Sequence, residues 1–146
     1  MRFSSLCWLL VVSGLVLSAA VVKAQTTSPQ SIAVLLKASR WQKRVLLLCA
    51  PTATDASLLR QRQLLASVRP DLEARDVLVQ EVLLNQLSAA DRGYMTKTLR
   101  VSGATFVALL VGKDGGVKRR ETAPVAPASL FKTIDVMPMR QQEMRQ

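Results

Sequence analysis

The sequence contains no histidine in its 146 residues. Histidine is the usual general base of Ser-His-Asp and Cys-His catalysis and a common zinc ligand, so these chemistries are excluded in their usual forms. The sequence also lacks a Gly-x-x-x-x-Gly-Lys-Ser/Thr phosphate loop and a dinucleotide-binding fingerprint. Acid-base chemistry would fall to carboxylates or lysine. We therefore expect no catalytic residue, no metal site and no cofactor, which argues against an enzyme.

Cysteine is nearly absent, since the chain has only Cys7 and Cys49. Cys7 falls in the leader described below, so the mature chain would keep one thiol and could form no internal disulfide. Cys49 lies in an apolar run, where a free cysteine is usually a small buried hydrophobic residue. The alternative is a redox-active thiol, which requires solvent exposure and a lowered pKa.

The first 24 residues contain no acidic residue, and a nearly unbroken apolar run covers positions 6–22. Arg2 precedes this run, and Val22-Lys23-Ala24 follows it with the small or modest residues that signal peptidase needs. We predict a signal peptide over residues 1–24, cleaved after Ala24, and export to the periplasm or the medium. The alternative is an uncleaved membrane anchor, because the run approaches the roughly 17 to 25 apolar residues that cross a bilayer.

The rest of the chain is predicted to be a polar linker over residues 25–31 and one domain over residues 32–146. Cleavage would remove Arg2 and Lys23, so the net charge falls from +10 to +8. In an exported protein this basic balance favours solubility, or contact with anionic envelope or extracellular polymers. We expect no nucleic-acid partner, and membrane contact only through an uncleaved leader.

Short apolar runs predict three buried strands, over residues 44–50, 77–84 and 105–111. Each run is rich in valine and leucine and contains no glycine or proline. The apolar segment over residues 32–39 is short enough to be either a helix or a strand.

The predicted helices alternate with these strands. We expect Asp55 to cap the first helix, which stops before Pro70, although Gln61 and Arg62 interrupt its apolar stripe. Ser88 is expected to cap the second, because it resembles the start of a capping box. A closing helix is predicted over residues 128–136.

The Asp114-Gly115 pair predicts a hairpin, because both residues tolerate positive φ angles. The strand after it, over residues 117–120, is rich in cations, as suits an edge strand that resists further pairing. The same cations are a candidate surface for an anionic ligand, and the alternative is a solvated protective edge. The candidate residues are Lys113, Lys118, Arg119 and Arg120.

Three methionines and a tryptophan are large apolar residues near the ends of the predicted domain. We expect them to fill gaps in the core, and the alternative is an adaptable partner surface. The residues are Trp41, Met137, Met139 and Met144.

The predicted order is strand, helix, strand, helix, a hairpin of two strands, and helix. Two strands joined by a helix form a parallel βαβ unit. This order predicts an α/β, thioredoxin-like fold with a four-stranded mixed sheet and helices on both faces.

Four sequence blocks resemble a known family: Trp41 to Leu48, Arg75-Asp76-Val77, Leu110 to Lys118, and Ile134 to Arg140. Together they are similar to the bacterial domain-of-unknown-function family numbered 4174. That family is similar to the thioredoxin-like domain of certain vertebrate extracellular-matrix proteins, including sushi-repeat proteins. The resemblance implies a thioredoxin-like fold without an established activity.

The chain departs from redox-active thioredoxins at two places. Residues 50–56 contain no Cys-x-x-Cys motif, and residues 101–105 lack the proline that faces a thioredoxin active site. Dithiol exchange within one chain is therefore excluded. The leading hypothesis is an exported, non-catalytic, thioredoxin-like binding module, and the alternatives are a single-cysteine redox protein based on Cys49 and a basic polyanion-binding protein.

Overall fold

The computed structural model describes residues 31–146, and it contains four strands and a set of short helices. The predicted signal peptide, and the predicted linker up to residue 30, lie outside the described residues. The strands are β1 (Arg44–Ala50), β2 (Val77–Leu83), β3 (Val107–Val111) and β4 (Val117–Glu121). The helices are α1 (Ile32–Ser39), α2 (Ala56–Ala66), α3 (Arg69–Glu73), η1 (Leu84–Gln86), α4 (Ala89–Lys97), α5 (Pro127–Asp135) and α6 (Pro138–Glu143).

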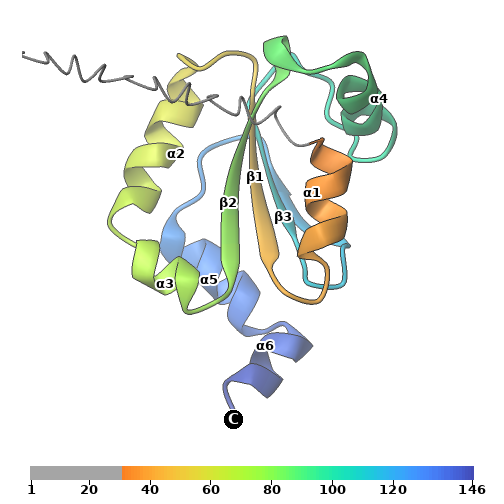
Figure 1. Ribbon diagram of the computed structural model, residues 1–146. Helices are drawn as coiled ribbons and strands as arrows, with labels where there is room; N and C mark the ends of the chain where they lie inside the picture. The colour runs from red at the N-terminus through yellow and green to blue at the C-terminus, as the bar shows by residue number, and fades with distance from the viewer. Residues whose placement is uncertain (1–30) are drawn as a thin grey trace, which may run out of the picture.

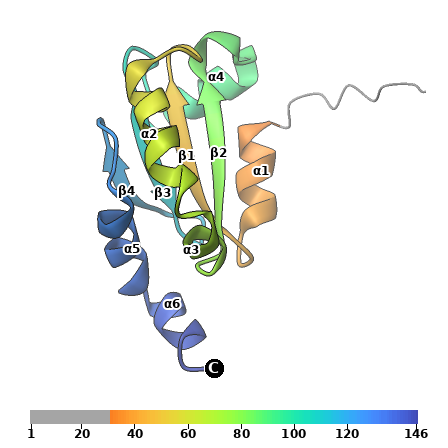
Figure 2. The ribbon, with the colours of Figure 1, turned by 90° about the vertical axis from the view of Figure 1, so that its left-hand side faces the viewer.

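The strands form one mixed sheet in the order β2-β1-β3-β4 (Figures 1 and 2). β1 pairs in parallel with β2 and antiparallel with β3, and β3 pairs antiparallel with β4. All residues of β1 are buried, as expected for an apolar strand in the middle of a sheet that is covered on both faces. The predicted α/β class with a four-stranded mixed sheet is confirmed.

The alternating side chains of β1 divide the core into two layers. Val45, Leu47 and Cys49 pack with residues of α1 and α4 on one face. Leu46 and Leu48 pack with residues of α2, α3 and α5 on the other face. Figures 1 and 2 show these two groups of helices on opposite sides of the sheet.

Two predicted helix caps are present. The Asp55 carboxylate accepts a hydrogen bond from the Leu58 amide at 3.0 Å, and the Ser88 hydroxyl accepts one from the Asp91 amide at 3.0 Å. Asp91 has a further role, because its carboxylate also accepts from the Ser31 hydroxyl at 2.7 Å. Asp91 therefore joins the start of α1 to the start of α4. The ambiguous segment over residues 32–39 is a helix.

Prolines begin two helices that the sequence did not predict. The helix that starts after Asp55 ends at Ala66, and Pro70 lies in the first turn of the separate helix α3. Pro138 likewise lies in the first turn of α6. Proline is well tolerated in a first turn, because an amide there has no partner within the helix and the proline ring already fixes a helical φ.

Gln61 is buried, with 1 % of its surface exposed, and does not interrupt the buried face of α2. Its side-chain amide donates to the Val125 carbonyl at 3.1 Å and accepts from the Val125 amide at 2.6 Å. These two hydrogen bonds satisfy the backbone N–H and C=O of Val125, which lies in the loop between β4 and α5 and pairs with no strand. The interpretation of Gln61 as a break in the stripe was wrong, because a primary amide can pair with both polar groups of one peptide residue.

The predicted hairpin joins β3 to β4 across residues 112–116. Gly115 has a φ of 85°, whereas Asp114 does not adopt a positive φ. This positive φ favours glycine, and a Cβ at Gly115 would also displace the guanidinium of Arg40, which lies against it. Strand β4 lies at one edge of the sheet, as predicted, and its register with β3 shifts between Leu110 and Val111.

The gap-filling role predicted for Trp41 and Met144 is wrong. Trp41 is 67 % exposed and Met144 is 53 % exposed. Trp41 sits in the turn after α1 with a φ of 64°, and α6, which Met144 follows, buries no residue. Met137 does pack against the core. No helix between residues 31 and 146 is long and apolar enough to cross a membrane.

Candidate functional site

The loop that follows β1 carries no thiol, and its exposed hydroxyls, those of Thr52 and Thr54, lie 3.3 Å from each other with no base beside them. This loop is the place where a thioredoxin would hold its cysteines, and its one ionisable side chain, Asp55, is used to cap α2. A pocket of about 370 Å³ lies beside it, lined partly by Pro51, Asn85 and Met95. Nothing in this loop supplies the thiol or the base that covalent chemistry would need.

Cys49 is fully buried in the layer between the sheet, α1 and α4. Burial raises the pKa of its thiol to about 12, against a smaller lowering effect from the positive charge of Arg120. The thiolate is the reactive form of cysteine, so this side chain is neither accessible nor ionised at neutral pH.

Lys113 is only 9 % exposed and does not lie on an open basic surface. Its ammonium group forms ion pairs with Asp76 at 2.9 Å and with Glu143 at 2.7 Å. Lys118, another predicted member of that surface, pairs with Asp114 within the hairpin.

Arg119 and Arg120 point to opposite faces of β4, because neighbouring residues of a strand alternate. Arg119 donates to the Glu121 carboxylate at 2.8 Å and to the Ser129 carbonyl at 2.9 Å, which ties it to α5. Arg120 donates to the Leu99 carbonyl on the other side. The structure therefore does not bring the four predicted cations together.

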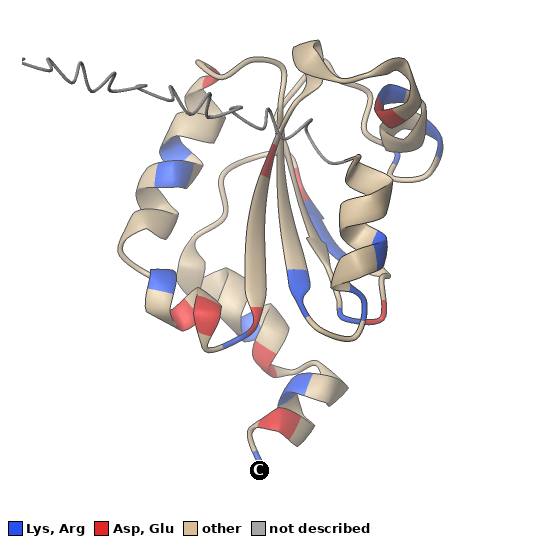
Figure 3. Cartoon of the chain, viewed as in Figure 1, with Lys and Arg blue, Asp and Glu red and all other residues tan. Residues whose placement is uncertain are grey.

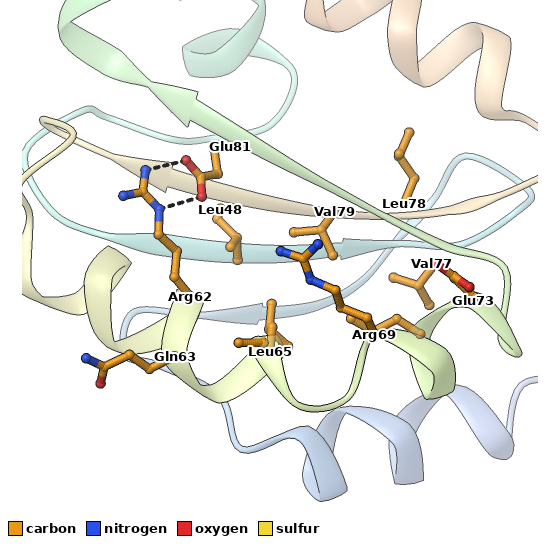
Figure 4. Close-up of a pocket in the computed structure, with 12 residues that line it drawn as sticks. Leu48, Arg62, Gln63, Leu65, Arg69, Glu73, Val77, Leu78, Val79 and Glu81 are labelled. Carbon is orange, nitrogen blue, oxygen red and sulfur yellow. Dashed lines mark hydrogen bonds and ion pairs between the residues drawn. The ribbon is translucent and has the colours of Figure 1, made fainter.

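A groove of about 840 Å³ lies between β2 and the helices α2 and α3 (Figure 4). Its floor is apolar and is formed from both the sheet and the helices. The main residues of this floor are Leu48, Leu65, Leu72, Val77 and Val79. Apolar floors with a few polar groups at the rim are typical of binding sites.

One end of the groove is closed by an ion pair between Arg62 and Glu81. The guanidinium donates two hydrogen bonds to the carboxylate, at 2.6 and 2.5 Å. The hydrogen bonding to Arg62 lowers the pKa of Glu81, so this carboxylate stays ionised and paired. Arg62 is therefore already neutralised.

Arg69 lies over the middle of the groove, close to Val77 and Val79 (Figure 4). Within residues 31–146 its guanidinium forms no ion pair and donates no hydrogen bond. Glu73 lies at the far end of the groove from the Arg62–Glu81 pair. An apolar floor below an unpaired arginine can bind a side chain or peptide that carries a carboxylate.

Sequence reasoning missed this groove. The run over residues 77–84 indicated a strand but not its place at the edge of the sheet. The only local signals are the polar pair Gln80-Glu81 inside that apolar run and the cation Arg69 directly before Pro70.

A second group of charges lies where α3, the start of β2, α5 and α6 meet (Figure 3). Asp76 accepts hydrogen bonds from Lys113 and Lys43, each at 2.9 Å, and these lower its pKa to about 2. Arg75 donates two hydrogen bonds of 2.9 Å to Asp135. These ion pairs neutralise one another's charges and join segments that are distant in the sequence, such as Asp76 to Lys113 and Arg75 to Asp135. Within the described range, no three potential metal ligands gather in one place.

Comparison with known proteins identifies relatives over the same region. The chain is 28 % identical over 140 residues to the "Coiled-coil domain-containing protein 80" of Danio rerio, which covers 80 % of this chain and 16 % of that protein. It is 29 % identical over 126 residues to the human "Sushi repeat-containing protein SRPX", covering 79 % of this chain and 27 % of that protein. The chain thus spans less than a third of the length of either relative.

A family model described as "Domain of unknown function (DUF4174)" matches residues 35–143. The match begins within α1 and ends at the last residue of α6, so it includes the whole sheet and both layers of the core. The resemblance inferred from the sequence blocks is confirmed, and the chain belongs to the DUF4174 family.

Proposed function

We propose that this protein is an exported, non-catalytic, thioredoxin-like module that binds a partner protein in the groove beside β2. The observation that carries the proposal is the apolar groove with the unpaired Arg69 above it. No comparable arrangement of reactive groups accompanies the loop after β1.

The strand order and directions support the thioredoxin-like interpretation, because a parallel βαβ unit is followed by an antiparallel hairpin and a helix. The redox function of that fold finds no support. The loop after β1 lacks cysteine, and the thiol of Cys49 is buried with a raised pKa.

Export is supported by the apolar leader over residues 1–24 and its small-residue cleavage pattern. A net positive charge, with many surface charges held in ion pairs, suits a protein that remains soluble outside the cell. The cations of β4 give little support to polyanion binding, because each of Lys118, Arg119 and Arg120 already has a partner within the chain.

Site-specific photocrosslinking tests the binding function. p-Benzoylphenylalanine is placed at Ala66, an exposed residue of α2 that lines the groove, or at Val34, which is 51 % exposed on α1 on the other side of the sheet. We expect a discrete protein adduct from position 66 in the native exported fraction and none from position 34. The adduct should weaken when Arg69→Glu is added. Equal adducts at both positions, or none at position 66, would contradict the proposed function.

A further inference from the structure

We propose that the groove binds an extended acidic segment of the partner, which adds to the free edge of β2 as a fifth strand and places a carboxylate against Arg69. This inference rests on the proposed function and names the conformation and chemistry of what the groove binds.

The backbone of β2 has a free side. β2 lies at the end of the sheet, and the Arg44 amide donates to the Asp76 carbonyl at 2.8 Å. In a parallel ladder alternate residues bond to the same neighbour, so Val77, Val79 and Glu81 direct their N–H and C=O groups away from β1. Among the described residues, no backbone group pairs with Val77 or Val79 on this side.

The two edges of the sheet differ in how they are protected. β4 has five residues and a shift of register with β3. Its arginines, Arg119 and Arg120, donate hydrogen bonds to the carbonyls of Ser129 and Leu99. β2 keeps regular pairing with β1 over seven residues, without proline, glycine or a shift of register. Natural proteins protect edge strands with bulges and charges, because a regular edge accepts further strands. β2 has the regular form, and Figure 2 shows it at the edge of the sheet opposite β4.

The free backbone and the groove belong to the same residues. Val77 and Val79 offer their backbone groups outward, and both also line the groove, whereas the Glu81 carbonyl already accepts a hydrogen bond from the Gln80 side chain at 2.8 Å. A strand paired with them would place every second side chain on the face of the sheet that forms the groove. Its other side chains would cover Leu78 on the opposite face.

The charges around the groove favour a partner segment that carries a carboxylate. The carboxylate of Glu81 is bound by Arg62, which leaves Arg69 as the unpaired cation above the apolar floor. Glu73 lies at the far end of the groove beside Val77, so a carboxylate is favoured nearer Val79. A second copy of this chain fits poorly, because the only acid of its β2 is already paired and both molecules are strongly basic.

Selection from a library of random nine-residue peptides, displayed against the exported protein, tests this inference. We expect selected peptides with apolar residues at alternate positions and one Asp or Glu between them. Selection against Arg69→Glu should replace that acid with Lys or Arg. Arg60→Glu is the matched control, because it makes the same charge change on α2 outside the groove; it should leave the selected sequences unchanged.

The best peptide is then made with N-methyl groups on the alternate amides that would face β2. Lost hydrogen bonds should weaken its binding about tenfold or more. The unmodified peptide should shift the amide resonances of Val77 and Val79. Undiminished binding of the N-methylated peptide, or selected sequences that do not depend on Arg69, would overturn the fifth-strand inference. A crosslinked partner at position 66 with either of these results would leave the proposed function standing.

Discussion

Glu143 and Arg44 are joined by two hydrogen bonds of 3.2 Å, although 99 positions separate them in the sequence. Arg44 begins the central strand and is 1 % exposed. Helix α6, which carries Glu143, buries no residue of its own. The last helix is therefore held to the sheet mainly by charge and not by apolar burial.

Replacing Glu143 with glutamine is expected to lower the free energy of unfolding by about 1 to 3 kcal/mol, because a buried guanidinium loses its counter-charge. Burial alone would raise the Glu143 pKa, but hydrogen bonds from Lys113 and Arg44 lower it, so the carboxylate is charged in the folded protein. Urea unfolding measures the change. Glu121→Gln is the control, since Glu121 pairs with Arg119 in a more exposed site and should cost less than about 1 kcal/mol. Equal losses would contradict the importance of the buried contact.

Acid is expected to destabilise the fold between pH 4 and pH 2. Hydrogen bonds from Lys113 and Lys43 lower the Asp76 pKa from 3.8 to about 2. A carboxylate whose pKa is lower in the folded state than in the unfolded state stabilises the fold at pH values above its unfolded-state pKa. This stabilisation is lost as the pH falls through the folded-state pKa. Urea midpoints measured across this range should fall, and the fall should be smaller in Asp76→Asn. Asparagine suits the φ of 51° at this position.

The matched control for the acid experiment is Glu73→Gln, which removes an acid that has no ion-pair partner within residues 31–146. Its acid sensitivity should match that of the unmodified protein. An unchanged pH profile in Asp76→Asn would show that other carboxylates cause the acid transition.

Gln61→Ala is expected to cost about 1 to 3 kcal/mol of stability, because it leaves the buried amide and carbonyl of Val125 without partners. Thermal or urea unfolding measures the loss. Gln63→Ala is a closely matched control on the same helix, where the side chain is exposed and accepts one long hydrogen bond from Arg60. A similar effect of both variants would mean that the Val125 pairing is unimportant.

Cys49 is expected to resist alkylation in the folded protein at pH 8 and to react fully in urea. The raised pKa and complete burial both suppress the thiolate. Peptide mapping by mass spectrometry separates Cys49 from Cys7. The exported protein and Cys49→Ser should show no turnover in an insulin-reduction assay. Turnover that depends on Cys49 would revive the single-cysteine redox alternative.

The exported protein is expected to begin at Gln25 and to remain soluble without detergent, because Val22-Lys23-Ala24 fits signal peptidase. N-terminal sequencing and carbonate extraction test both points. Ala24→Trp should block cleavage and leave the protein in the membrane pellet. Intact Met1 on the exported unmodified protein, pelleting with membranes, would identify the leader as an anchor.

The sheet could be predicted from the sequence because each buried strand is a continuous apolar run, and the helix starts because Asp55 and Ser88 cap locally. The groove could not. It depends on β2 lying at an edge, which is decided by pairing between distant segments, and on Arg69 remaining unpaired. Lys113 and Gln61 were misjudged for the same reason, since their partners Glu143 and Val125 are far away in the sequence.

The closed edge at β4 also limits how many chains can join the sheet. Its shift of register and its arginines, which are bound to α5 and to the Leu99 carbonyl, leave a poor template for another strand. A strand accepted by β2 would therefore have no counterpart on the opposite side of the same molecule. Growth by edge pairing would stop after one addition, so the protein can keep one open edge without the means to polymerise into a fibre.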